Sequence, residues 1–131
     1  MIHLDTHAVA WLYAGDLARF PQRVREVLEE EELTVSPIVE LELELLYEIR
    51  RIADPGRTIL DDLTGRVGLR VSSAPFHRVV AAAAKLDWTR DPFDRLIVGQ
   101  ALADTARLVT RDRAIRRYYR AALWAGDERK R

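Results

Sequence analysis

The stretch IHLDTHAVAWL, residues 2–12, decides the fold expected for this chain. Residues 2–4 are a short apolar run with the length of a buried strand, and the apolar pattern after Asp5 is typical of a helix. Asp5 therefore stands between a strand and a helix. A carboxylate at such a position either caps the helix or reaches into a binding site, and the sequence leaves both interpretations open.

The same alternation of strand and helix continues along the chain. Further short strands are predicted at 33–36, 69–73 and 107–110, with a last edge strand near 121–124. Between them we expect helices over 6–14, 22–31, 38–52, 57–65, 75–86 and 92–105, and a short arginine-rich helix after residue 112. This alternation predicts an α/β fold with a parallel sheet.

Length and composition fit one folded domain. The chain has 131 residues, 48% of them hydrophobic and 32% charged, and we expect a single domain over residues 1–131. It contains no cysteine, which excludes disulfides, a thiolate nucleophile and cysteine metal sites. The longest apolar run, residues 79–84, is much shorter than the roughly 20 residues of a membrane span, and no signal peptide is apparent. A cytoplasmic location is expected.

The formal net charge of zero conceals two halves of opposite charge. Residues 1–62 carry 6 basic and 14 acidic side chains, a charge of −8, and residues 63–131 carry 15 and 7, a charge of +8. Much of the positive charge is a cluster of arginines, whose planar guanidinium groups suit phosphates. A solvated helix face is the alternative interpretation. The cluster comprises Arg107, Arg111, Arg113, Arg116, Arg117 and Arg120.

The helix predicted at 38–52 contains one glutamate that is expected to point inward. At about 100° per residue, its apolar stripe is centred about 25° from Ile38 and includes Val39, Leu41, Leu45, Leu46, Ile49 and Ile52. Glu42 lies within this stripe, at about 40°, whereas Glu40, Glu44 and Glu48 lie on or toward the opposite side. Because an unpaired buried carboxylate is costly, Glu42 requires a partner such as a buried arginine, or a functional role.

Two more acids precede and begin the helix predicted at 92–105. Asp91 is placed to be its N-cap, with Pro92 at the first helical position, and a structural role is expected for it. Asp94 shares a helical face with Ile97 and Val98, so it is directed inward and a functional role is expected. Asp112 follows the strand predicted at 107–110, as Asp5 follows the first strand.

Four acids are thus expected to converge where parallel strands end, because ligands in open α/β sheets bind outside the carboxyl ends of the strands. Carboxylates about 4 Å apart repel by about 4 kcal/mol at an effective dielectric constant of 20, so a cation is needed among them. Ligation by oxygen alone favours Mg²⁺ or Mn²⁺ over zinc. His3 and His7, which flank Asp5, are interpreted as packing or surface residues. The four acids are Asp5, Glu42, Asp94 and Asp112.

Four segments together resemble the PIN-domain ribonucleases, most closely the VapC-like toxins of prokaryotic toxin–antitoxin pairs. The resemblance covers nearly the whole chain, and Glu42 also matches the family's spacing of six residues from Ser36. The segments are LDTHAVAWL (4–12), SPIVELELELL (36–46), RDPFDRLIVGQAL (90–102) and LVTRD (108–112).

The resemblance implies a three-layer α/β/α sandwich around a mainly parallel sheet, and Mg²⁺-dependent cleavage of RNA, with Mn²⁺ as a substitute. It further implies a homodimer that is held inactive by a VapB-like antitoxin. Asp5, Glu42, Asp94 and Asp112 match the family's metal-binding acids, and Thr6, Asp91 and Thr110 match their polar neighbours. From the charge of the second half, RNA contacts are expected at Arg113, Arg116 and Arg117.

Two other functions remain open. Clustered acids on an α/β fold also occur in receiver-like regulatory domains, although such a domain needs a late lysine and this chain has only Lys85 and Lys130. The chain could also be a PIN module that binds RNA or protein without cleaving it. The presence of all four acids argues against that second alternative.

Overall fold

A computed structural model of the chain describes residues 1–125, so six residues of the predicted domain lie outside the described part. Its centre is a five-stranded sheet with the order β3-β2-β1-β4-β5, and every neighbouring pair of strands is parallel. The predicted sheet is therefore confirmed, and it is wholly rather than mainly parallel. The strands are β1 (Ile2–Leu4), β2 (Leu33–Val35), β3 (Arg70–Val71), β4 (Arg107–Val109) and β5 (Ala122–Leu123).

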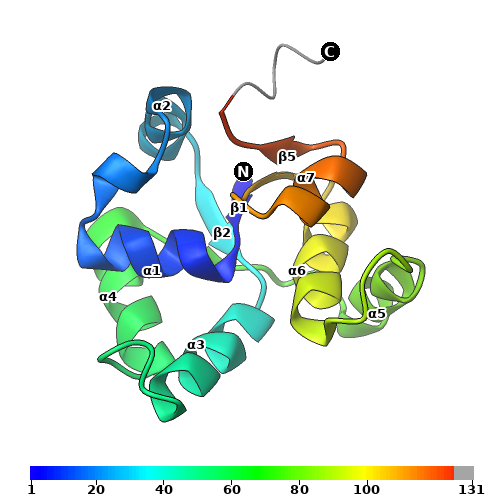
Figure 1. Cartoon of the computed structure of the whole chain (residues 1–131), viewed down its shortest axis with the longest axis horizontal. Helices are drawn as coiled ribbons and strands as arrows, with labels where there is room; N and C mark the ends of the chain where they lie inside the picture. The colour runs from blue at the N-terminus through cyan, green and yellow to red at the C-terminus, as the bar shows by residue number, and fades with distance from the viewer. Residues whose placement is uncertain (126–131) are drawn as a thin grey trace.

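Helices cover both faces of this sheet. Figure 1 shows α1, α3 and α4 on one side of the strands and α5 and α6 on the other, which confirms the predicted three-layer sandwich. No helix among residues 1–125 is both long and apolar enough to cross a membrane. The helices are α1 (Thr6–Ala14), the 3-10 turn η1 (Leu17–Arg19), α2 (Gln22–Glu30), α3 (Ile38–Glu48), α4 (Gly56–Val67), α5 (Phe76–Ala84), α6 (Pro92–Ala103) and α7 (Arg113–Tyr118).

The middle strands are buried on both sides. Ile2 and Leu4 of β1 and Leu108 and Val109 of β4 are at most 1% exposed. A strand covered by helices on both faces needs apolar side chains in both directions, which explains why these strands appear in the sequence as continuous apolar runs.

The strand order creates a crevice beside β1. The chain adds β2 and β3 on one side of β1 and then returns to add β4 and β5 on the other side. At such a switch point the loops after the two diverging strands separate, and ligands bind between them. The backbone N–H of Asp5 donates to the carbonyl oxygen of Val109 at 3.1 Å, which fixes the ends of β1 and β4 together.

Two glycines allow the helices around this crevice to pack closely. A Cβ atom at Gly56 would meet the carbonyl oxygen of Glu40 at 2.5 Å, so glycine lets α4 approach α3. A Cβ atom at Gly99 would meet the carbonyl oxygen of Val79 at 2.8 Å, so glycine lets α6 approach α5. These contacts fix α3 and α6, the helices that carry Glu42 and Asp94.

Helix α3 differs from its prediction in two ways. It ends at Glu48 instead of residue 52, because Arg50 adopts a left-handed backbone with φ of 63°. Its buried face is formed by Val39 and Leu43, both 0% exposed, and the predicted inward stripe is largely exposed, with Leu41 at 57%. Ile38, Val39 and Ile52 of the stripe pack in or against the core, whereas Leu41, Leu45 and Ile49 are exposed.

Candidate active site

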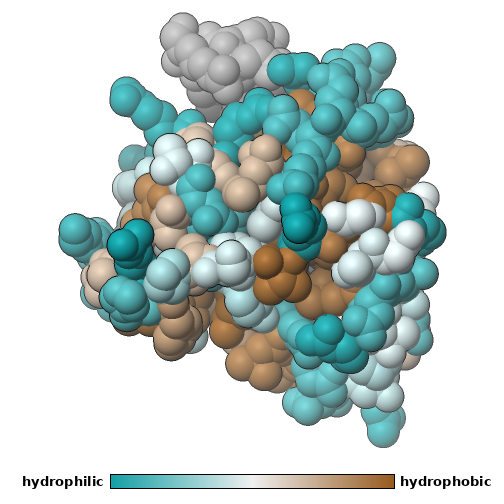
Figure 2. Space-filling model, turned by 180° about the vertical axis from the view of Figure 1, so that it is seen from behind, coloured by the Kyte–Doolittle hydropathy of each residue, from teal (hydrophilic) through white to brown (hydrophobic). Residues whose placement is uncertain are grey.

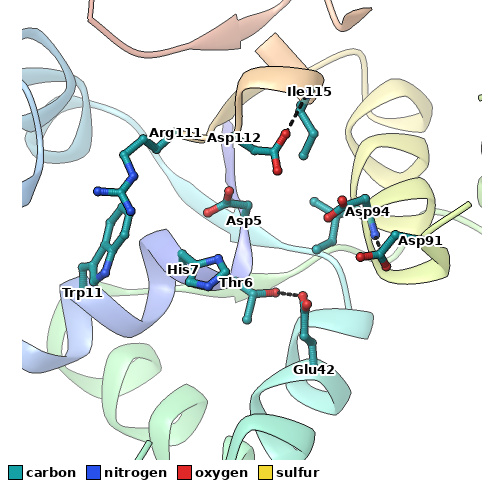
Figure 3. A pocket seen from close by; sticks show the side chains of 11 residues that line it. Asp5, Thr6, His7, Trp11, Glu42, Asp91, Asp94, Arg111, Asp112 and Ile115 are labelled. Carbon is teal, nitrogen blue, oxygen red and sulfur yellow. Dashed lines mark hydrogen bonds between the residues drawn. The ribbon is translucent and has the colours of Figure 1, made fainter. Parts of the chain in front are cut away.

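A pocket of about 280 Å³ opens in the crevice beside β1, and acidic side chains surround it (Figure 3). The four acids predicted to converge all line this pocket, together with Asp91. They come from four different parts of the chain: the end of β1, α3, the start of α6 and the loop after β4. The pocket is lined by Asp5, Thr6, His7, Trp11, Glu42, Asp91, Asp94, Ile97, Arg111, Asp112 and Ile115.

Asp5 and Asp112 both cap helices and line the pocket. Asp5 Oδ1 accepts a hydrogen bond of 2.9 Å from the backbone N–H of Ala8 in α1. Asp112 Oδ1 accepts one of 2.9 Å from the backbone N–H of Ile115 in α7. The capping interpretation of Asp5 is therefore confirmed, and its role in a binding site stays a prediction, although capping fixes the direction of a carboxylate that also lines the pocket.

Asp91 and Asp94 occupy different environments at the start of α6. Asp91 is an exposed N-cap, whose Oδ1 accepts from the backbone N–H groups of Phe93 at 2.9 Å and Asp94 at 3.3 Å. The Asp94 side chain is half-buried and forms no hydrogen bond with any residue from 1 to 125. Asp91 therefore has the predicted structural role, whereas capping does not account for the side chain of Asp94.

The two threonines among the predicted supporting residues orient the acids. Thr6 Oγ1 donates to Glu42 Oε1 at 2.5 Å and so holds the α3 glutamate against the start of α1. Thr110 is fully buried and does not line the pocket, but its Oγ1 accepts a hydrogen bond of 3.0 Å from the backbone N–H of Asp112. It therefore shapes the loop after β4.

Burial, together with the crowding of carboxylates, raises several pKa values in the pocket. Burial raises the pKa of Asp94 to about 7, and the negative charges of Asp91, Asp112, Glu42 and Asp5 add to the rise. At neutral pH this carboxyl group therefore exchanges readily between its charged and neutral forms.

Asp5 and Glu42 are shifted in the same direction. The pKa of Asp5 is raised chiefly by burial and further by Asp112, while the Thr110 hydroxyl opposes the rise. The pKa of Glu42 is also raised chiefly by burial, and the hydrogen bond from Thr6 opposes that rise. The pocket thus holds more negative charge than its own residues compensate.

This set of donors fits a hard divalent cation. All the acidic donors are oxygens, which Mg²⁺ and Mn²⁺ prefer, and a bound cation would offset both the burial of these carboxylates and the repulsion that adds to the rise of their pKa values. Among residues 1–125, no three histidine, aspartate or glutamate side chains lie at ligand spacing around one point. The acids surround the pocket, but they are not close enough together to coordinate one ion as a set.

The three arginines expected to contact RNA lie outside the pocket lining. They are on α7, the helix capped by Asp112. Arg113 and Arg117 are exposed, and the guanidinium of Arg117 lies 5.5 Å from the ring centroid of Tyr118. Arg116 is half-buried and donates to the carbonyl oxygen of Ala125 at 3.3 Å.

Besides the apolar Ile97 and Ile115, three pocket residues were not identified from the sequence: His7, Trp11 and Arg111. Trp11 belongs to the apolar pattern of α1, and nothing in that pattern distinguishes it from a core residue. Arg111 was counted only as part of the arginine cluster. Its position between the buried Thr110 and the strand-end acid Asp112 is the signal that could have identified it.

Comparison with known proteins agrees with this fold. The PIN domain family model matches residues 2–121. Over 116 residues the chain is 34% identical to ribonuclease VapC22 of Mycobacterium tuberculosis (strain ATCC 25618 / H37Rv), a match that covers 86% of this chain and 88% of that protein. The chain therefore belongs to the PIN domain family. Within that family it is VapC-like, and the receiver-like alternative is set aside.

A solved structure has the same fold. The chain matches a protein in the crystal structure of VapBC2 from Rickettsia felis bound to a DNA fragment from their promoter, with a TM-score of 0.64 and 20% identity. The match covers 94% of this chain and 97% of that one. At this level of identity the likeness supports the architecture alone.

Proposed function

We propose that this protein is a divalent-metal-dependent endoribonuclease and the toxin of a VapBC-type toxin–antitoxin pair. The observation that carries the proposal is the state of Asp94, a half-buried carboxylate without a hydrogen bond among residues 1–125, whose pKa is raised to about 7 beside four other acids. Such an arrangement destabilises the protein unless it serves to bind a cation. Membership of the PIN family and similarity to a ribonuclease support RNA as the substrate.

Asp5, Glu42, Asp94 and Asp112 would hold Mg²⁺, with Mn²⁺ as a substitute. When bound, the ion would lower the pKa of a water molecule and neutralise negative charge on the phosphodiester. The protein would contribute orientation. Helix capping fixes Asp5 and Asp112, and the Thr6 hydroxyl holds Glu42, so that few side chains have to reorganise when substrate arrives.

Arg113, Arg116 and Arg117 would contact the RNA backbone beside the pocket. Their helix begins directly after Asp112, so phosphates that flank the cleaved bond would lie within reach of α7. The exposed Arg113 and Arg117 are better placed for this role than the half-buried Arg116.

The test of this proposal is incubation of the purified, antitoxin-free chain with total cellular RNA. We expect discrete cleavage products with Mg²⁺ or Mn²⁺ and intact RNA when EDTA is present in excess. RNA that stays intact across a series of metal concentrations would instead favour a PIN module that binds RNA without cleaving it. RNA cleaved equally well in EDTA would refute metal dependence.

The proposed partners are a VapB-like antitoxin and a second copy of the chain. The similarity to ribonuclease VapC22 and the resemblance to VapC-like toxins support an antitoxin for this chain. Both partners, and the RNA substrate, imply action in the cytoplasm.

Exposed apolar side chains on α3 and α5 support the homodimer. Phe76 is 70% exposed and Leu41 is 57% exposed, and both line one hollow together with Ile38 and Leu96. Brown apolar areas are visible on the face shown in Figure 2. The stripe of α3 that was predicted to be buried would then be buried in the dimer, because apolar patterning does not distinguish a core from an interface.

Substitution of this surface should separate the two copies. We expect Leu41→Glu and Phe76→Glu each to convert a dimer into a monomer in light scattering coupled to gel filtration, because a charge would be buried at the centre of the contact. Val67→Glu is a matched control, since Val67 is an exposed apolar residue on α4. If Leu41→Glu and Phe76→Glu are as dimeric as Val67→Glu, this surface is not the interface.

A further inference from the structure

Trp11 forms a fixed aromatic wall of the acidic pocket. Its ring packs against Phe20, with centroids 5.8 Å apart in an edge-on arrangement, and against Trp124 at 6.1 Å. Phe20 and Trp124 are 2% and 6% exposed, so they anchor Trp11 in the core. Trp11 itself is only half-buried and reaches the pocket.

Arg111 lies on this wall. Its guanidinium carbon is 4.8 Å from the centroid of the Trp11 ring, at a distance where cation and ring attract each other. Figure 3 shows Arg111 extending from the loop after β4 onto the face of the indole. The stacking fixes the orientation of a side chain that would otherwise be free to rotate.

Arg111 forms no ion pair with any residue from 1 to 125, although acids line the same pocket. Arg19 provides an internal comparison, because it also lies over Trp11, at 5.5 Å, but its Nε donates to Asp16 Oδ2 at 2.7 Å. Of these two guanidinium groups, Arg19 is already neutralised by a carboxylate. Arg111 keeps its N–H donors available to a ligand.

An acidic pocket would repel a nucleic acid strand unless a cation on its wall attracted it. Figure 3 shows Arg111 and Trp11 on one side of Asp5, and Asp94 and Asp91 on the other. A planar guanidinium suits the oxygens of a phosphate, to which it can donate two parallel hydrogen bonds.

We propose that Arg111, held in place by Trp11, binds the RNA phosphate next to the one that is cleaved, on the side of the pocket opposite Asp94. This inference rests on the proposed ribonuclease function and adds a substrate-binding residue to it. Arg111 anchors the strand so that the neighbouring phosphodiester lies over the acids. It contributes affinity and position, while the acids serve the chemistry.

The test measures binding of a fluorescein-labelled single-stranded RNA of mixed sequence to the full chain in EDTA. We expect Arg111→Gln to weaken binding by about tenfold, as for loss of one charge-assisted contact. The slope of log affinity against log salt should fall by about 0.7. Arg25→Gln, which removes an exposed arginine on α2 that does not line the pocket, should leave both quantities unchanged.

Arg111→Lys separates charge from geometry. It should keep the salt slope of the wild type but bind RNA more weakly, because an ammonium group cannot stack on Trp11 and donate in parallel as a guanidinium does. In Mn²⁺, cleavage by Arg111→Gln should show an increased KM with kcat little changed, the result expected when a contact binds substrate and transition state equally. Thermal melting confirms that each variant is folded.

The outcomes distinguish this inference from the function on which it rests. If the wild type cleaves RNA but Arg111→Gln matches Arg25→Gln in affinity, salt slope and KM, the role of Arg111 is refuted and the ribonuclease stands. If the wild type binds RNA through Arg111 without cleaving it, the ribonuclease is refuted and the role of Arg111 in binding stands. A wild type that does not bind RNA at all refutes both.

Discussion

Glu42→Gln is expected to slow RNA cleavage at least about a hundredfold, whereas Glu40→Gln and Glu44→Gln should leave the rate within about twofold. The glutamine at position 42 can still accept the hydrogen bond from Thr6, but it brings no negative charge to the pocket. Its effect would therefore reflect loss of cation binding more than loss of packing. Single-turnover cleavage of a defined RNA in Mn²⁺ is the measurement.

The two control residues lie on the same helix and serve other contacts. Glu40 pairs with Arg57, and Glu44 Oε1 accepts from the backbone N–H of Gly56 at 3.1 Å, so both join α3 to α4. A glutamine at 44 keeps an acceptor for that bond, and the exposed pair at 40 contributes little to stability. Equal rates in all three variants would remove Glu42 from the set of acids.

The positions of the acids could be predicted because each follows from local rules. Asp5 and Asp112 were placed at strand ends by short apolar runs, and parallel strands bring their carboxyl ends to one edge. Asp94 was placed by the helical face that it shares with Ile97 and Val98. In the structure these three side chains line one pocket with Glu42. Their assignment as metal ligands stays a prediction.

The reasoning that selected Glu42 was wrong in one step although Glu42 does line the pocket. The helical wheel assumed that the whole apolar stripe faces the core. Leu41 and Leu45 of that stripe are exposed, whereas Val39 at its edge and Leu43 outside it are buried. Glu42 lies between the two faces and reaches the pocket edge half-buried. A single sequence reports which side chains are apolar, but it does not report which surface they meet.

The contact between Trp11 and Arg111 was beyond sequence reasoning for a different reason. Arg111 lies at the end of a strand, beside an acid that the sequence argument had singled out. Trp11 is an ordinary apolar position of α1, one hundred residues earlier in the chain. Their proximity depends on β1 and β4 being neighbours in the sheet. The alternation of strands and helices predicted a parallel sheet, but it did not give the order of the strands.

Asp94→Asn is expected to stabilise the metal-free protein at neutral pH and to lose most of the stabilisation that metal provides. A carboxyl group with a folded-state pKa near 7 and an ordinary unfolded-state pKa of 3.8 binds more protons in the folded state between these values. The free energy of unfolding of the wild type in EDTA should therefore fall as pH rises from about 4 to about 7. The variant should lack this part of the pH dependence, because its amide does not titrate.

Excess Mn²⁺ should reverse the order of stability. At a hundredfold excess over Kd, ligand binding adds about 2.7 kcal/mol to the free energy of unfolding, or about 10 °C in Tm for a chain of this size. The variant should gain much less, because it lacks one donor and one charge. Thermal melting of the wild type and the variant, each in EDTA and in Mn²⁺ and each at pH 5 and at pH 7.5, is the measurement.

The opposite result is expected if Asp94 only stabilises α6 through the helix dipole. The variant would then melt lower than the wild type in EDTA, by an amount equivalent to at most about 1 kcal/mol. If the variant does so and gains as much from Mn²⁺ as the wild type, Asp94 stabilises the helix and binds no metal.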